Sequence, residues 1–164
     1  MSLHGSAACP AACSGATRLH GSAAAWNAEG VLLLGRPGAG KSDLVLRLLD
    51  HGFRLVADDQ VVLSDRDGIA TADAPDALAG MLEVRGLGLL TGLAHGPAAI
   101  RLVVDCVERA EEPRLPEPRD WTHGSARVPR VALHAIDSSA PQKVMAAMDC
   151  LAGRRSMVVG AFAA

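Results

Sequence analysis

The chain has 164 residues and a formal net charge of −2, with 18 acidic against 16 basic residues, and this near balance excludes the strong overall field that attracts nucleic acid or an anionic membrane. Hydrophobic residues make up 49% of the chain and aromatic residues only 2%, which predicts a core of Leu, Val and Ala and argues against aromatic stacking as the way a nucleobase is held. The length fits one domain, and no apolar run approaches the roughly 20 residues of a membrane helix.

The amino-terminal residues 1–18 are rich in Ala, Ser, Gly and Cys and lack helical or strand periodicity, so we expect a poorly ordered tail followed by one domain over residues 19–164. The four cysteines lack the paired spacing of a zinc site and the density of a disulfide scaffold, which favours thiols in a reducing cytoplasm. The alternative is a metal site made by Cys9 and Cys13 with His4 or His20.

The predicted elements alternate between strands and helices, which indicates an α/β fold with a mixed sheet. Two strands joined by a turn at Asn27–Gly30 precede a glycine-rich loop, and a short amphipathic helix follows it. In chain order we predict strands at 19–26 and 31–35, a helix at 42–50, strands at 53–59 and 60–64, a hairpin turn at 65–68, strands at 99–105 and 130–136, a surface loop at 113–118 and a helix from about 139 to 153.

The loop "GRPGAGKS" matches the phosphate-loop pattern GxxxxGK followed by Ser or Thr at every fixed position. Its position between an apolar strand and a helix allows backbone amides and the helix dipole to hold phosphate. We expect Lys41 to reach the terminal phosphates and Ser42 to bind magnesium. The predicted nucleotide-binding residues of this loop are Gly35, Arg36, Pro37, Gly38, Ala39, Gly40, Lys41 and Ser42.

Asp58 and Asp59 end the strand that follows the helix directly, only 16 residues after the loop. If this strand returns beside the strand that carries the loop, its carboxyl end meets the bound phosphates. One carboxylate is then expected to bind the metal while the other acts as a base. The alternative is a solvated acidic turn.

Two further features are weaker on their own. Glu83 and Arg85 in "MLEVRGLGLL" share one face of an extended chain, so the carboxylate could complete a magnesium shell and the guanidinium could bind a phosphoryl oxygen. An exposed ion pair is the alternative. His20 lies one hairpin before the loop and is within reach of the site, although a structural role is the commoner one for a single histidine.

The stretches "RLHGSAAAW", "VLLLGRPGAGKSDLVLRLLDHGFRLVADDQVVL" and "LEVRGLGLL" resemble, in order and spacing, the catalytic domain of the bacterial HPr kinase/phosphorylase family. The likeness is to the short alphaproteobacterial form, which lacks the amino-terminal domain. It implies a phosphate-loop fold similar to that of phosphoenolpyruvate carboxykinase. It also implies a cytoplasmic homo-oligomeric kinase of the sugar or nitrogen phosphotransferase system, which phosphorylates a serine of the phosphocarrier protein HPr with ATP and Mg²⁺ and reverses the reaction with inorganic phosphate.

Carried over by position, the resemblance implies that Asp58 is the base, with His20 beside it and Lys41 on the phosphate. Ser42, Asp59 and Glu83 then surround magnesium, and Arg85 belongs to the nucleotide site. The region "HAIDSSAPQK" departs from the family, because longer members have an arginine-containing loop there. Arg127 or Arg130 from a neighbouring subunit is one possible substitute. A non-catalytic nucleotide sensor and a kinase of a small metabolite are the competing functions.

Overall fold

The computed structural model describes residues 15–163, so residues 1–14 of the predicted tail, with Cys9 and Cys13, lie outside the described residues. The described residues form two α-helices, α1 (Lys41–Leu49) and α2 (Ala140–Leu151), and two 3-10 helices, η1 (Asp76–Leu78) and η2 (Arg109–Glu111). The strands are β1 (Thr17–His20), β2 (Ser22–Trp26), β3 (Glu29–Leu34), β4 (Arg54–Ala57), β5 (Gln60–Arg66), β6 (Ile69–Asp73), β7 (Leu82–Val84), β8 (Gly88–Leu90), β9 (Ala98–Cys106), β10 (Asp120–His123) and β11 (Ala126–Leu133).

A nine-stranded mixed sheet organises the fold, in the order β1-β5-β6-β9-β3-β2-β4, and β11 pairs with β9 and with β10. The strands β3, β9 and β11 run parallel to one another, whereas β2 is antiparallel to both β3 and β4. The carboxyl ends of β11, β9, β3 and β4 therefore meet at one edge of the sheet, where α/β folds place their ligands.

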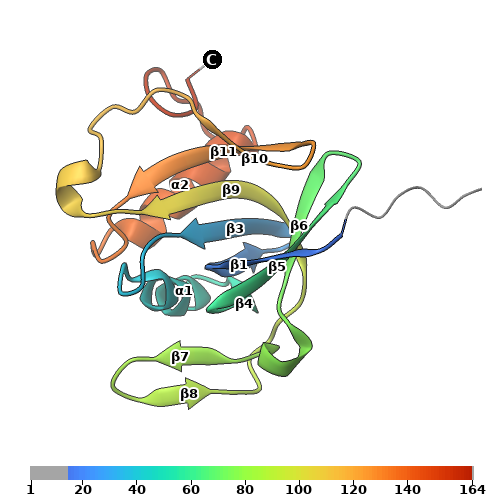
Figure 1. Cartoon of the computed structure of the whole chain (residues 1–164). Helices are drawn as coiled ribbons and strands as arrows, with labels where there is room; N and C mark the ends of the chain where they lie inside the picture. Colours follow the sequence, from blue (N-terminus) through green and yellow to red (C-terminus); the bar gives the residue numbers. More distant parts are fainter. Residues whose placement is uncertain (1–14, 164) are drawn as a thin grey trace, which may run out of the picture.

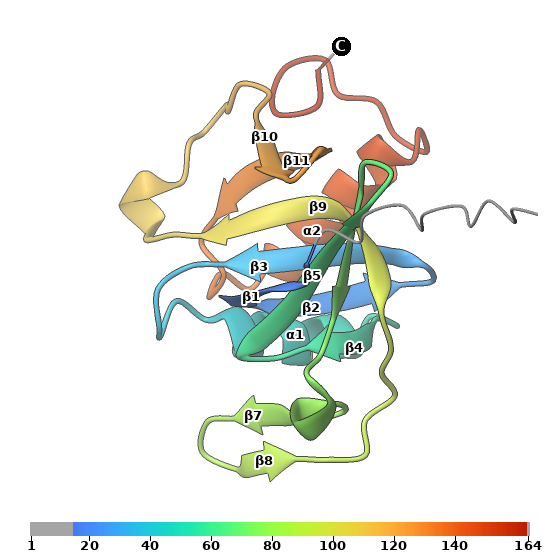
Figure 2. The same cartoon turned by 45° about the vertical axis from the view of Figure 1, so that its right-hand side comes forward.

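Both faces of this sheet are covered (Figure 1). The helices α1 and α2 pack on one face, where a first core cluster joins Leu44, Val45 and Leu48 of α1 to Val144 and Met148 of α2. Figure 2 shows that β5 and β6, which belong to the same sheet, cross in front of its opposite face. A second core cluster of Val, Leu, Ile and Ala residues fills the space between them and that face. The helix residues lie on one stripe because positions three and four apart share a helix face.

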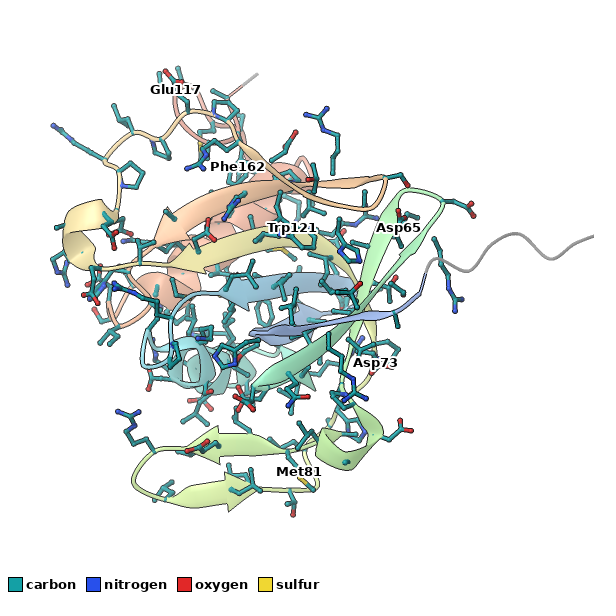
Figure 3. The ribbon with its side chains drawn as sticks, in the orientation of Figure 1. Asp65, Asp73, Met81, Glu117, Trp121 and Phe162 are labelled. Atoms are coloured by element: carbon teal, nitrogen blue, oxygen red, sulfur yellow. The ribbon has the colours of Figure 1, made fainter. Side chains whose placement is uncertain are left out.

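Two hairpins extend from the sheet (Figures 1 and 2). The β7–β8 hairpin lies below α1 and β4 and is anchored by Leu82, which is fully buried in the first core cluster. The β5–β6 hairpin is joined to the β10–β11 turn by Asp65, whose carboxylate accepts hydrogen bonds from the backbone N–H and the hydroxyl of Ser125 (Figure 3). These hydrogen bonds lower the pKa of Asp65, the hydroxyl contributing most.

The predicted helices and most of the predicted strands are confirmed to within a few residues, and the turn after β5 has positive φ at Asp67 and Gly68, as a hairpin turn requires. The expected continuous strand at 19–26 is wrong, because the chain breaks at Gly21 and β1 pairs with β5 while β2 pairs with β3 and β4. A Cβ at Gly21 would stand 2.9 Å from the carbonyl oxygen of Leu33, so only glycine fits this close crossing.

A second correction concerns the strand that carries the acids. It was expected beside the strand of the phosphate loop, but β2 lies between β3 and β4. Since β2 is antiparallel to both, β3 and β4 still point the same way, and the acids still reach the loop's edge of the sheet. No helix among residues 15–163 is long and apolar enough to cross a membrane.

Candidate functional site

The phosphate loop joins the end of β3 to the start of α1, and at two of its glycines a close contact adds to the requirement set by a positive φ. Gly35 has φ 149°, and a Cβ there would lie 2.7 Å from the carbonyl oxygen of Cys106. Gly40 has φ 92° and caps α1 in the left-handed conformation, directly under the side chain of Ile136. An L-residue would be strained at both places, so the loop's shape depends on these glycines.

Lys41 is held at the centre of the loop. Its side chain is 6% exposed, and its ammonium donates hydrogen bonds to the carbonyls of Gly35 (2.8 Å) and Arg36 (2.9 Å). Two of three ammonium protons are therefore used to fix the group, and one is left for a phosphate oxygen. The amino terminus of α1 opens at the same point, which adds the positive end of the helix dipole.

Asp58 is buried, at 6% exposure, and accepts three hydrogen bonds. The hydroxyls of Ser22 and Ser42 both donate to Oδ1 at 2.7 Å, and the backbone N–H of Glu83 donates to Oδ2 at 3.2 Å. The carboxylate is thus joined to the phosphate loop through Ser42, to the start of β2 through Ser22 and to the β7–β8 hairpin through Glu83. Its position is set by three separate elements of the chain.

Asp59 has a different environment, although it is the next residue. The backbone makes a tight turn there, with φ 65° at Asp59 and a hydrogen bond of 2.8 Å from the N–H of Gln60 to the carbonyl of Asp58. The Asp59 side chain is 65% exposed, and its Oδ1 lies 3.4 Å from Nδ1 of His20. Left-handed backbone at a residue other than glycine is uncommon and is tolerated best by Asp and Asn. The turn sends the two carboxylates to different surroundings.

The β7–β8 hairpin brings Glu83 and Arg85 to the same region. Glu83 lies in β7, whereas Arg85 falls in the turn after it, so the two are not both in an extended strand as the sequence pattern assumed. Both nevertheless line the cavity described next.

A cavity with a volume of about 430 Å³ unites these residues. Of the residues predicted from the sequence, His20, Pro37, Gly38, Gly40, Lys41, Ser42, Asp59, Glu83 and Arg85 line it. Asp58 lies behind Ser42 and is joined to the site by its hydrogen bond. The predicted residues Gly35, Arg36 and Ala39 belong to the loop but are not among the described residues that line the cavity.

Sequence reasoning missed several residues that line the cavity, namely Ser22, Asp43, Leu46, Val84 and Ile136. Ser22 lies within the stretch "LHGSAAAW", and its offset of two residues from His20 was the available signal. Ile136 had no signal, because the sequence predicts it as the last residue of the strand 130–136, where an apolar residue is ordinarily a core residue.

Arg127 and Arg130 are engaged within their own chain. Arg127 pairs with Asp120 and Arg130 makes a two-pronged pair with Asp105, which raises the pKa of Arg130 above its usual value. Neither is among the described residues that line the cavity. In the described part of the chain no group of three or more His, Cys, Asp or Glu residues could by itself hold a metal ion. Magnesium in phosphoryl-transfer sites commonly needs only one or two carboxylates besides phosphate oxygens.

Comparisons with known proteins agree on one family. A family model described as the HPr Serine kinase C-terminal domain matches residues 12–104. The HPr kinase/phosphorylase of Clostridium beijerinckii is 46% identical over 74 residues, which are 45% of this chain and 24% of that protein. The HPr kinase/phosphorylase of Clostridium tetani is 45% identical over the same length and the same shares. The matched stretch therefore spans about a quarter of the length of these relatives.

A solved structure, the Hpr(Ser) kinase/phosphatase from Coxiella burnetii, superimposes with a TM-score of 0.71. The match covers 84% of this chain and 97% of that one at 20% sequence identity. A likeness at this identity concerns the fold, and it confirms the predicted α/β fold with a mixed sheet.

Proposed function

The chain belongs to the HPr serine kinase C-terminal domain family, and from this premise we propose that it transfers the γ-phosphoryl group of ATP to a serine hydroxyl of an HPr phosphocarrier protein. The observation that carries the proposal is the single cavity in which the phosphate loop, Lys41, Ser42, Asp59 and His20 come together. Phosphoryl transfer needs positioning and charge stabilisation more than covalent chemistry, and this set of groups supplies both.

We propose separate roles for the two aspartates. The family resemblance implies that Asp58 is the base and Asp59 a magnesium ligand, whereas their surroundings favour the reverse assignment. Asp58 is buried and hydrogen-bonded to Ser42, so it fits the metal side of the site. Asp59 is exposed to the cavity beside His20, so it fits the base that accepts a proton from an incoming serine. A base must reach the proton of its substrate, and only the exposed carboxylate lines the cavity.

Magnesium fits the donor set on the metal side, since the Ser42 hydroxyl and the Asp58 carboxylate are hard oxygen ligands 2.7 Å apart, with Glu83 adjoining them through its backbone N–H. The metal, when bound, would neutralise charge on the β- and γ-phosphoryl oxygens. Ser42 and Asp58 would hold it, and Glu83, which lines the same cavity, would supply a further carboxylate.

In the forward reaction the serine oxygen forms a bond to the γ-phosphorus while the bond from that phosphorus to the bridging oxygen of ADP breaks. Asp59 accepts the serine proton, and His20 steadies that carboxylate through the 3.4 Å contact. Lys41 and the loop amides stabilise the charge on the transferring group. In the phosphorolysis direction an oxygen of inorganic phosphate forms a bond to the phosphorus of phosphoserine while the bond from that phosphorus to the serine oxygen breaks, which gives pyrophosphate. The protonated Asp59 returns its proton to the departing serine oxygen.

The test is phosphorylation of HPr by the purified protein with ATP and Mg²⁺, with the modified residue located by mass spectrometry. We expect phosphoserine on HPr, its loss in Lys41→Met, and its removal when ATP is replaced by inorganic phosphate. ATP binding without transfer to HPr would instead favour a nucleotide sensor, and transfer to a small hydroxyl compound would favour a metabolite kinase.

A further inference from the structure

The segment after β11, residues 134–139, enters the cavity with one apolar side chain. Ile136 is 60% exposed, yet it lines the same cavity as Lys41 and Asp59. We propose that Ile136 is the apolar wall of a subsite for the nucleoside half of a nucleoside triphosphate. The inference rests on the proposed function and adds to it the residue that holds the base and ribose.

The order of the strands places Ile136 at the end of the site away from the acids. The phosphate loop follows β3; on one side come β2 and β4 with Asp59, and on the other come β9 and β11, after which Ile136 follows. A triphosphate in the loop directs its reacting end toward the acids. Its nucleoside end must then leave the loop on the opposite side, beside Ile136.

The phosphate loop and Ile136 are in direct contact. A Cβ built on Gly40 would lie 3.0 Å from Cγ1 of Ile136, so the isoleucine rests on the last turn of the loop. Leu46 of α1 lines the cavity as well, but it follows Ser42 by four residues and so shares the helix face of Ser42, which is hydrogen-bonded to Asp58. Ile136 is therefore the aliphatic side chain that the described residues offer at this end of the cavity. Aliphatic contact suits a chain in which only 2% of residues are aromatic, because a base can be held by apolar surface on its faces without stacking on a ring.

Arg47 of α1 holds the backbone of residues 135–137 in place. Its guanidinium donates to the carbonyl of Asp137 at 2.8 Å and also to the carbonyl of Ala135, so it binds the backbone on both sides of Ile136. Asp43, which lines the cavity, accepts from Arg47 at 2.9 Å. Arg47 is therefore a positioning residue that holds Ile136 over the loop.

The carboxylate of Asp137 is held in addition. Arg109 of η2 and Lys143 of α2 both pair with it. Burial raises the pKa of Asp137, but the hydrogen bond from Arg109 and the charges of Arg109 and Lys143 outweigh burial and hold this pKa below its usual value. Three cationic side chains, those of Arg47, Arg109 and Lys143, therefore bind residues 135–137. We expect this segment to keep its conformation when a ligand covers Ile136. Such rigidity suits a wall for a small ligand, because little conformational entropy is lost on binding.

The test uses titration calorimetry in the presence of Mg²⁺ to measure how tightly the protein binds each of two probes, ATP and inorganic tripolyphosphate. Ile136→Ala removes about three carbons of apolar contact, so we expect ATP to bind about five- to tenfold more weakly. Tripolyphosphate has no nucleoside, and its affinity should stay within about twofold of the wild-type value. Ile69→Ala is the matched control, since Ile69 is also exposed, at 51%, and lies on β6 away from the cavity.

The outcomes separate the subsite from the proposed function. Unchanged ATP affinity in Ile136→Ala would overturn the subsite, and so would an equal loss of affinity for both probes. A loss of HPr phosphorylation without any loss of ATP affinity would overturn it too, and would mean that Ile136 contacts the protein substrate instead. If the wild type binds ATP as expected but never phosphorylates HPr, the subsite stands while the proposed function falls.

Discussion

The two adjacent aspartates allow one prediction for stability and another for activity. Asp58→Asn should cause the larger loss of unfolding free energy, and Asp59→Asn should cause the larger loss of HPr phosphorylation. In Asp58→Asn the side-chain oxygen can still accept from the two serine hydroxyls, but the new amide nitrogen then faces the backbone N–H of Glu83. Two donors then face each other in a buried place, which costs about 1–3 kcal/mol of unfolding free energy. Asp59→Asn changes only an exposed group, and asparagine tolerates φ 65°, so the expected loss is below about 0.5 kcal/mol.

Activity should follow a different order. Asp59→Asn removes the proposed base, so HPr phosphorylation should fall by about 10²- to 10⁴-fold while ATP still binds. Asp58→Asn should weaken the binding of Mg²⁺, shown by a higher magnesium concentration at half-maximal rate. Urea unfolding measures the first pair of effects, and ATP titration with an HPr phosphorylation assay measures the second.

The result that would refute this reasoning is specific. If Asp59→Asn phosphorylates HPr at the wild-type rate while Asp58→Asn is folded, binds Mg²⁺ and ATP normally and is inactive, then Asp58 is the base. The assignment from burial and hydrogen bonding would then be wrong, and the assignment from the family resemblance would be right.

Three further predictions concern the loop and its neighbours. Gly35→Ala should destabilise the protein by about 1–3 kcal/mol in urea unfolding and weaken ATP binding, because its Cβ would lie 2.7 Å from a backbone oxygen; wild-type stability would contradict the strain argument. Arg47→Met should weaken ATP binding but spare tripolyphosphate, as we expect for Ile136→Ala, since it frees both carbonyls beside Ile136; equal loss for both probes would show a general structural role. Burial raises the pKa of Cys106 to about 12, opposed by the charge of Lys41, so in the folded protein this thiol should resist alkylation at pH 8. The unfolded thiol ionises from about pH 9 while the folded one does not, so its contribution to stability is complete below pH 9 and is lost as the pH rises toward 12; rapid native alkylation of Cys106, followed by peptide mass spectrometry, would contradict this.

The loop, the helix and the strand with the acids could be predicted from the sequence because they are local. The fixed offsets of "GRPGAGKS" place Gly35 and Lys41 relative to each other through a few backbone dihedrals. The apolar spacing in α1 decides which helix face is buried. Asp58 and Asp59 follow directly after β4, the next strand in the chain, so their place is set by the same local unit. This information is carried by neighbouring residues, and it is enough to name six of the residues that line the cavity: Pro37, Gly38, Gly40, Lys41, Ser42 and Asp59. His20, Glu83 and Arg85 lie in other segments, and the family resemblance supports them more than local pattern does.

The tertiary structure alone decided what the neighbouring chain segments add to that unit. The insertion of β2 between β3 and β4 brings Ser22 to Asp58, and the strand order brings Ile136 to Gly40, although the latter two are 96 positions apart in the sequence. The separate environments of Asp58 and Asp59 also depend on contacts made by three distant elements and on one left-handed turn. Pairing of distant strands is settled by packing and register over the whole sheet, and no local pattern of residues specifies it.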